Sequence, residues 1–488
     1  MPDLTLAARS DIQGMILSGY GHLPDAAYQF LQIHNVAQFK VWLSRLIPAI
    51  TTAKPWDIQP DGTKAKPEMA VNLAWSYAGL RAIGLAPEIL NTFAREFIEG
   101  MITPKRSELL GDTGTSAPEH WDVGGSQNPE IHLVLILHGL NREQIQQYLR
   151  DLLPEAAGVR TIATEYGFRP PHQKEHFGFH DAISQPQIEG TGDQPTAPEN
   201  VIRTGEFILG YANEYGLLPS PPTVPRTQDA NDLLPDLVIP DAATGASTLK
   251  DLGRHGTYLV YRKLAQDVAG FWQFMAQHGQ DATGCPAASD MLLLAAKFVG
   301  RWPNGTPLVL SPTQDDPSIE NANQFQYMPE DAGGFACPIA SHIRRTNPRD
   351  SLDGSPAESF KTARRHRILR RGSIYGEPLF PLEALDQHTV PLDIAEDGQP
   401  RGLHFFGVNV NIERQFEFIQ QTWSNNPKFN GLYNDKDPIS GDNDGSGVMT
   451  IPRHPIRERV NHLPRFVTVR GGGYFFLPSL TAIRFFAL

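Results

Sequence analysis

The stretch Met69 to Leu85, MAVNLAWSYAGLRAIGL, contains a β-forming apolar run, a short turn and a segment with helical spacing. The first part is typical of a strand, because β-forming and apolar residues dominate it over about seven positions. The part after the turn repeats its apolar residues every three or four positions, as one face of a helix does. This stretch therefore predicts a strand followed directly by a helix.

Three further segments repeat this strand-to-helix pattern. In Ile131 to Leu149, the strand-like ILHGL leads into Asn141, with Gln144 three positions on as a capping-box partner. In the second half of the chain, Thr257 to Arg262 runs into LAQDVAGFWQFMAQH, and Leu403 to Asn411 runs into IERQFEFIQQTW. Two such units in each half indicate an internal repeat.

The repeat, with additional strands such as Arg160 to Tyr166, predicts an α+β fold of two ferredoxin-like modules. Each module would be an antiparallel sheet with helices packed on one face. A doubly wound nucleotide-binding fold is disfavoured, because none of these strand ends carries a phosphate-binding glycine fingerprint. We place the module boundary after residue 200, so that the first module covers residues 1–200 and the second covers residues 201–488. The Pro-, Asp- and Gly-rich stretch 190–256 is interpreted as ordered loops or a lid, with a plain linker as the alternative.

Composition excludes several classes of function. The chain is 40% hydrophobic and 20% charged, as in ordinary globular proteins, and its net charge of −12 disfavours a nucleic-acid partner. No apolar run approaches the roughly 18 residues that a membrane span needs. The stretch MPDLTLAARSDIQG lacks the basic and apolar segments of a signal peptide, so we expect a cytoplasmic protein. A homo-oligomer is compatible with the sequence.

A basic stretch stands out in the second half of this acidic chain. Eight arginines follow His342: Arg344, Arg345, Arg349, Arg364, Arg365, Arg367, Arg370 and Arg371. Guanidinium groups pair well with carboxylates and phosphates, so the cluster predicts an anionic ligand, unless it is a solvated face that pairs with the chain's own carboxylates. An imidazole beside arginines suited to two propionates is what a haem pocket needs.

A second candidate segment is Phe177 to Pro186, FGFHDAISQP. It places Asp181 among glycine, aromatic and small residues, where burying a carboxylate without a purpose is costly. The structural alternative for this residue is an Asx turn or a helix N-cap.

Taken together, these segments resemble the motifs of the dye-decolorizing peroxidase family. FGFHDAISQP resembles the family's Gly-x-x-Asp-Gly motif, CPIASHIRRTNPR its proximal-histidine segment and HRILRRGSIYG its distal-arginine segment, in the same order. QFEFIQQTWSNNPKF and DPISG are also similar to the family's C-terminal half, and the resemblance extends from about Met69 to the end. It implies a duplicated, dimeric α+β barrel type of fold with haem b in the C-terminal module. One departure is Ala182, where the family has a glycine; alanine disfavours a positive φ.

The resemblance implies roles for residues on the two faces of the haem. On the proximal face His342 would ligate the iron, and a carboxylate would accept its second ring N–H. Asp437 of DPISG is our choice for that carboxylate, with Glu413 as the alternative. The other positions that match haem-lining residues of the family are Ile183, Ser184, Asn347 and Arg349.

On the distal face, Asp181 would accept a proton from hydrogen peroxide and return it to the departing oxygen. Arg370 would stabilise the negative charge that develops on the peroxide, and it contributes to the haem pocket as well. We prefer Arg370 to Arg371, because ILR precedes the glycine-containing turn as in the family. A neighbouring guanidinium would keep Asp181 ionised in acid.

The resemblance thus implies a haem-dependent peroxidase that reduces hydrogen peroxide and oxidises bulky aromatic donors, such as dyes and phenols, best at acidic pH. Two alternatives remain open at this stage. One is a non-enzymatic haem carrier or sensor that uses the same pocket, and the other is an anion-binding α+β protein without haem.

Overall fold

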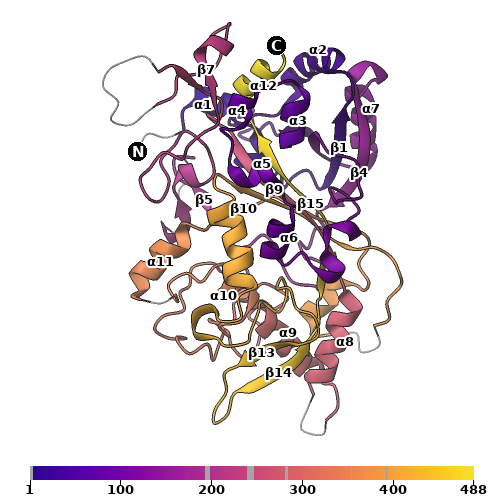
Figure 1. Cartoon of the computed structure of the whole chain (residues 1–488). Coiled ribbons are helices and arrows are strands. Elements are labelled where there is room, and N and C mark those ends of the chain that lie inside the picture. Colours follow the sequence, from indigo (N-terminus) through magenta and orange to yellow (C-terminus); the bar gives the residue numbers. More distant parts are fainter. Residues whose placement is uncertain (1–3, 193–197, 239–246, 281–283, 353, 391–393) are drawn as a thin grey trace.

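The structure is a computed structural model, and it describes residues 4–192, 198–238, 247–280, 284–352, 354–390 and 394–488. In Figure 1, helices α2, α3, α7 and α12 gather at one end of the molecule. Helices α8 and α9 and the hairpin β13–β14 lie at the other end. None of the helices in these residues combines the length and the apolar character needed to cross a bilayer.

The first half of the chain forms one ferredoxin-like module. Its strands stand in the order β4-β1-β3-β2, all antiparallel. One helix follows β1 and another follows β3, which is the βαββαβ arrangement. The elements are β1 (Asp25–Ile33), α2 (Val36–Leu46), β2 (Met69–Trp75), β3 (Leu133–Gly139), α7 (Arg142–Leu152) and β4 (Val159–Phe168).

The second half repeats this plan. Its strands stand in the order β15-β9-β12, followed by one strand that is interrupted into β11 and β10. Here α8 follows β9, and two π-helical turns follow β12. The elements are β9 (Thr257–Gln266), α8 (Val268–His278), β10 (Leu369–Arg370), β11 (Ser373–Tyr375), β12 (Gly402–Asn409), the turns Glu413–Glu417 and Ile419–Ser424, and β15 (Val467–Leu477).

The two modules close into one barrel. Strand β2 meets β15 through the pair Trp75–Phe476, and β4 meets β11 through the pair Phe168–Ile374. The barrel interior is filled by side chains such as Phe30, which is fully buried. Closure leaves neither module with a long open sheet edge. The predicted α+β fold of two ferredoxin-like modules is therefore confirmed.

Several short helices and hairpins complete the first half and the chain ends. The helices are α1 (Leu6–Asp11), α3 (Tyr77–Ala82), α4 (Pro87–Leu90), α5 (Arg95–Glu99), α6 (Pro104–Leu110) and α12 (Leu480–Phe486). The chain forms ordered loops in the described part of 190–256, and these loops contain β6 and the antiparallel pair β7–β8. Residues 193–197 and 239–246 lie outside the described residues. The short strands are β5 (Gln187–Ile188), β6 (Val201–Ile202), β7 (Thr223–Pro225) and β8 (Leu249–Asp251).

A long insertion between α8 and β11, together with the hairpin β13–β14, builds a second apolar core beside the barrel. Phe271 and Trp272 of α8 are buried in it, so the insertion packs firmly on the second module. This insertion carries the predicted proximal histidine. Its helices are α9 (Ala288–Val299), α10 (His342–Thr346) and α11 (Pro356–Arg364). The hairpin, which follows β12 in the chain, consists of β13 (Gly447–Ile451) and β14 (Glu458–Leu463).

Some local predictions need correction. The helix expected from LAQDVAGFWQFMAQH begins only at Val268, because β9 continues to Gln266 and Asp267 caps the helix by accepting from the Gly270 N–H. The side chain of Asn141 caps α7 as predicted, with the Gln144 N–H 2.9 Å away. Strand β4 ends at Phe168 and β9 begins at Thr257, and the module boundary at residue 200 stays a prediction.

Candidate active site

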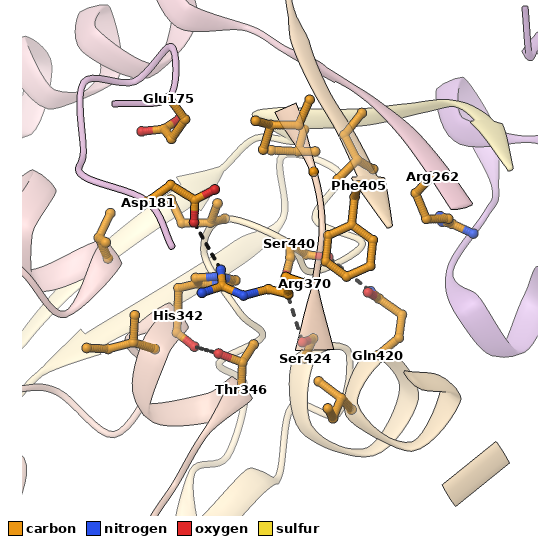
Figure 2. A pocket seen from close by; sticks show the side chains of 18 of the residues that line it. Glu175, Asp181, Arg262, His342, Thr346, Arg370, Phe405, Gln420, Ser424 and Ser440 are labelled. Carbon is orange, nitrogen blue, oxygen red and sulfur yellow. Dashed lines mark hydrogen bonds and ion pairs between the residues drawn. The ribbon is translucent and has the colours of Figure 1, made fainter. Parts of the chain in front are cut away.

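A cavity of about 350 Å³ lies between the sheet of the second module and the insertion. Strands β9, β12 and β15 form one wall, and α10 with the loop after Asp437 forms another. The loop that contains Asp181 contributes further lining. Apolar side chains such as Phe405 and Ile343 line most of it, as in cofactor pockets of this size. Figure 2 shows Asp181, Arg370 and His342 projecting into this one space.

His342 begins helix α10 and faces the cavity. Its Nδ1 is hydrogen-bonded to Asp437 Oδ2 at 2.9 Å, which leaves Nε2 as the ring nitrogen available to a ligand. Burial favours a lower pKa for His342, but the Asp437 carboxylate outweighs it and raises the pKa above its ordinary value. The same contact lowers the pKa of Asp437, although burial acts in the opposite direction. The His342 ring thus donates its Nδ1–H to the ionised Asp437 carboxylate, which makes Nε2 a stronger electron donor to a metal.

The Asp437 carboxylate is held by its own turn. Its Oδ1 accepts the backbone N–H groups of Ile439 and Ser440 at 2.8 and 2.9 Å, and its side chain is 0% exposed. The Asn443 side chain donates to its backbone carbonyl. Glu413, the alternative partner, is exposed on the first π-helical turn, so it does not reach His342.

Asp181 and Arg370 form an ion pair at the cavity, with Oδ1 and Nη1 3.1 Å apart. Arg370 ends the short strand β10, and its backbone N–H donates to the Gln185 side chain. Arg371, the next residue, lies on the opposite face of the strand, because side chains alternate there. Its guanidinium donates to the carbonyls of Met15 and Ile16, so it takes no part in the cavity.

Ala182 adopts a positive φ, which is unfavourable for an alanine. Its φ is +64°, and its N–H donates to the Asp181 carboxylate at 2.6 Å. A left-handed backbone costs an alanine about 1–2 kcal/mol, whereas a glycine adopts it freely. The turn that presents Asp181 is therefore strained.

Most of the arginine cluster has a different role from the one we expected. Arg345 is buried and donates to three backbone carbonyls, and Arg344 pairs with Asp331 at 3.0 Å. Arg349 is also buried and donates to the carbonyls of Asn323 and Phe325, although it lines the cavity as predicted. Arg344 and Arg349 fix loops of the insertion, and Arg345 fixes the chain in and after the second π-helical turn, so neither a shared anionic ligand nor a solvated basic face describes them.

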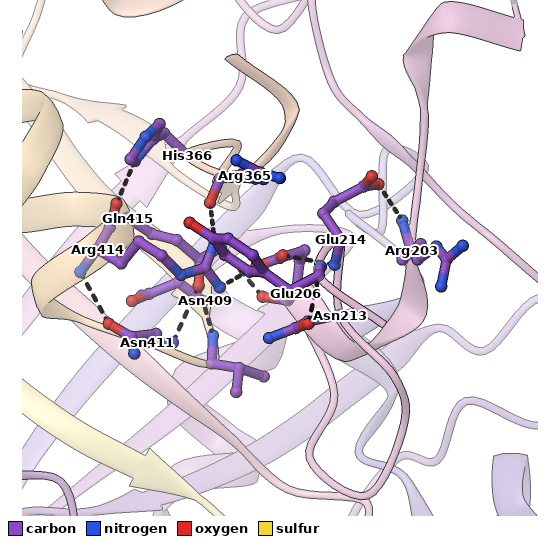
Figure 3. A network of polar contacts seen from close by, with 12 residues as sticks. Arg203, Glu206, Asn213, Glu214, Arg365, His366, Asn409, Asn411, Arg414 and Gln415 are labelled. Carbon is purple, nitrogen blue, oxygen red and sulfur yellow. Dashed lines mark hydrogen bonds and ion pairs between the residues drawn. The ribbon is translucent and has the colours of Figure 1, made fainter. Parts of the chain in front are cut away.

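The segment around α11 belongs to a separate polar network, shown in Figure 3. Arg364 pairs with Glu214 at 2.9 Å. Arg414 donates to the Arg365 backbone carbonyl and to the buried Glu206 carboxylate. This network ties the 190–256 region to the second module.

Arg367 is the exception, and nothing in its local sequence distinguishes it from the rest of the cluster. Its guanidinium is buried at the cavity and makes one hydrogen bond, to the Ser184 carbonyl at 3.2 Å. No carboxylate pairs with it among the described residues. Burial, followed by the neighbouring arginines, lowers its pKa to about 9. The Ser184 hydroxyl beside it is buried and has no hydrogen-bond partner in the described part of the chain, so this wall offers donors to an acidic group of a ligand.

These features fit an iron porphyrin. The His342 imidazole, held by Asp437, suits an iron whose other ligands come from a macrocycle, since the described residues contain no cluster of three metal-binding side chains. The apolar lining suits the ring, and Arg367 suits a propionate. Ile183, Ser184 and Asn347 also line the cavity, and their contact with haem stays a prediction.

Glu175 is a further cavity residue that sequence reasoning missed. It lies six positions before Asp181, and Figure 2 shows it near that residue. Only its position just before the aromatic motif could have drawn attention to it.

The fold and the site together define an enzyme of the dimeric α+β barrel class. A family model described as DyP dimeric alpha+beta barrel domain matches residues 11–164. The dye-decolorizing peroxidase of Mycena epipterygia is 31% identical, over 97% of this chain and 86% of that protein. The chain belongs to the dye-decolorizing peroxidase family. It is an oxidoreductase, a peroxidase of the dye-decolorizing type, and peroxidases of this type are haem enzymes.

Solved structures agree with this assignment. The dye-decolorizing peroxidase of Auricularia auricula-judae superposes with a TM-score of 0.74 at 26% identity, covering 98% of this chain and 100% of that one. A peroxidase of the same type from Anabaena sp. gives a TM-score of 0.73 at 25% identity, covering 98% and 95% of the two chains. Another structure, with a TM-score of 0.75, 26% identity and coverage of 98% and 100%, describes engineering of the heme pocket of a dye-decolorizing peroxidase.

Proposed function

We propose that this chain binds haem b and uses hydrogen peroxide to oxidise bulky aromatic donors, such as dyes and phenols. The observation that carries the proposal is the meeting of two polar pairs in one apolar cavity: His342 with Asp437, and Asp181 with Arg370. The bound iron porphyrin would supply the redox chemistry, taking electrons from the donor and passing them to peroxide. The relatives are named for dye decolorization, and one of them is described as having a heme pocket.

On the proximal side, His342 would hold the iron through Nε2. Asp437 accepts the Nδ1–H, which fixes the tautomer and the direction of the ring. The two backbone N–H groups on Asp437 keep that carboxylate in place. Arg367 would bind a propionate, with the Ser184 hydroxyl as an additional donor.

On the distal side, the Asp181 carboxylate would accept a proton from hydrogen peroxide and later donate it to the departing oxygen atom. Arg370 would stabilise the negative charge on the deprotonated oxygen. Its Nη1 lies 3.1 Å from Asp181 Oδ1, so the guanidinium faces the space where Asp181 would take the proton. We expect turnover to be best at acidic pH, as the resemblance to the family implies.

The test is an absorption spectrum of the purified protein before and after one equivalent of hydrogen peroxide. We expect a Soret band, a haem content of one per chain and a rapid spectral change on adding peroxide. A Soret band without such a change would favour a haem carrier or sensor. A protein that stays colourless after expression with sufficient haem would contradict the proposal.

A further inference from the structure

Glu175 occupies the cavity wall beside Asp181, and its carboxylate is bonded to the loop that carries that residue. Oε1 accepts the Phe179 N–H and Oε2 accepts the Phe177 N–H, both at 2.9 Å. Backbone bonds from Glu175 N–H to the Phe179 carbonyl and from Gly178 N–H to the Glu175 carbonyl tighten the same loop. Asp181 follows two residues after Phe179 in this loop. One side chain thus fixes the loop from which Asp181 projects.

No cation pairs with Glu175 in the part of the chain that the structure describes. The neighbouring basic side chains bind other groups. Lys174 binds Asp386, and His176 binds the Tyr375 carbonyl. Arg401, whose backbone carbonyl accepts the Gln266 N–H, binds Glu396 and Asp397. The charged group that acts on Glu175 is Asp181, which has the same sign. Burial, with a smaller contribution from Asp181, raises the pKa of Glu175 to about 6.

Gln266 of β9 can pair with either protonation state of this carboxyl. Its side-chain amide lies 2.5 Å from Glu175 Oε2, and its Oε1 is buried without a partner. The amide can donate an N–H to a carboxylate, or turn and accept an O–H from a carboxylic acid. Turning breaks no other hydrogen bond of the Gln266 side chain. The contact therefore persists when Glu175 gains or loses a proton.

We propose that Glu175 is a positioning residue for Asp181: its carboxyl group fixes the loop that carries Asp181, and when that group ionises it places a second negative charge at the peroxide site. The neutral acid keeps the loop bonded without adding a charge there. The ionised form opposes the negative charge that develops when peroxide gives up its proton, because like charges repel in a low-dielectric cavity. Glu175 thereby sets the upper pH limit of the peroxide reaction. This kinetic role depends on the proposed function, whereas the protonation state of Glu175 does not.

The first measurement is infrared difference spectroscopy of the purified holoprotein between pH 5 and pH 8, without peroxide. We expect a protonated-carboxyl C=O band that disappears with a midpoint near pH 6. Glu175→Gln should lack this band. Glu143→Gln, an exposed position on α7, should retain it. A spectrum without such a band, or a band that Glu175→Gln retains, would overturn the proposal even if the protein is an active peroxidase.

The second measurement is the rate of reaction with hydrogen peroxide across the same pH range. The parent and Glu143→Gln should lose rate through a step near pH 6, and Glu175→Gln should lose that step. Gln266→Leu removes the bond to this carboxyl group in both protonation states. The bond to the charged carboxylate is the stronger of the two, so the step should move to higher pH, which tests Glu175 in a second background. A step that stays near pH 6 in both variants would exclude the positioning role.

Discussion

The two sides of the cavity are built differently. On the proximal side Asp437 is 0% exposed and His342 is 29% exposed, and the carboxylate is fixed by backbone N–H groups of its own turn. On the distal side Asp181 and Arg370 are 48% and 33% exposed, and the turn beside them includes the strained Ala182. The difference indicates that the proximal pair maintains one geometry, whereas the distal pair meets solvent and a small reactant. Substitutions on the two sides should therefore fail in different ways.

The largest effect should come from His342→Ala. The variant removes the ligand on the better-fixed side, so we expect loss of bound haem or of its proximal ligation, and with it all peroxidase activity. Haem content and the Soret spectrum of the purified variant measure this. His120→Ala, at an exposed position, is the control and should keep both. Full haem content with an unaltered spectrum in His342→Ala would disprove the assignment of the iron ligand.

Asp181→Asn should affect chemistry and not cofactor binding. An amide cannot accept the proton from peroxide, so we expect the rate with peroxide in acid to fall by about 10²- to 10⁴-fold, with haem retained. Stopped-flow absorbance gives the rate, and the resting spectrum gives the haem content. A variant that reacts as fast as the parent would remove Asp181 from the proposed mechanism.

Arg370→Leu and Arg371→Leu separate the two faces of one strand. Loss of Arg370 should slow the peroxide reaction by about 10²-fold, because a preorganised cation is removed. Loss of Arg371 should leave the rate nearly unchanged but lower the free energy of unfolding by about 2–3 kcal/mol, since it leaves buried carbonyls without donors. Urea unfolding and stopped-flow kinetics on both variants test this. The reverse pattern would transfer the distal role to Arg371.

Glu175 should also make stability depend on pH. Its folded pKa of about 6 lies above the unfolded value of 4.5, so the folded state binds the proton more tightly. This contribution is complete below pH 4.5 and is lost as the pH rises through 6. Between pH 4 and pH 7 the parent should lose at most about 2 kcal/mol of unfolding free energy relative to Glu175→Gln. Urea titrations at several pH values measure the difference, and parallel curves for the two proteins would contradict it.

The smallest effect should come from Ala182→Gly. Glycine relieves the positive φ but costs entropy on folding, so we expect the unfolding free energy to rise by about 1 kcal/mol or less. Ala276→Gly in α8 has a helical backbone and should instead lower it by about 1 kcal/mol. Urea midpoints distinguish the two. A loss of stability in Ala182→Gly would mean that the turn is not strained.

Much of the architecture could be predicted because its signals are local. Each strand-to-helix unit buries one face, so its apolar period appears in the sequence, as in Met69 to Leu85. The first unit, β1 with α2, was missed, and the stretch after β12 winds as π-helical turns where a helix of ordinary spacing was expected. Hydrogen-bond spacing within a helix leaves no clear mark on the apolar pattern.

The candidate site divides in the same way. The motif residues His342, Asp181 and Arg370 meet at one cavity, as the resemblance implied. Arg367 and Arg345 have the same local chemistry, yet one faces the cavity and the other is bonded to three carbonyls. Tertiary packing determines which arginine faces the cavity without a carboxylate partner among the described residues, and no spacing rule contains that information. Glu175 was missed for the same reason, because its environment comes from β9 and from the cavity.

The barrel has two narrow seams. Four strands separate them on either side, and each seam is a single residue pair, Trp75 with Phe476 and Phe168 with Ile374. Within each module, by contrast, neighbouring strands such as β1 and β3 pair over seven consecutive residues. Local opening of the native protein should therefore start at these two seams. Amide protons there would exchange with solvent before those of β1 and β3. The molecule would then part into two half-shells, each of which keeps its own sheet intact.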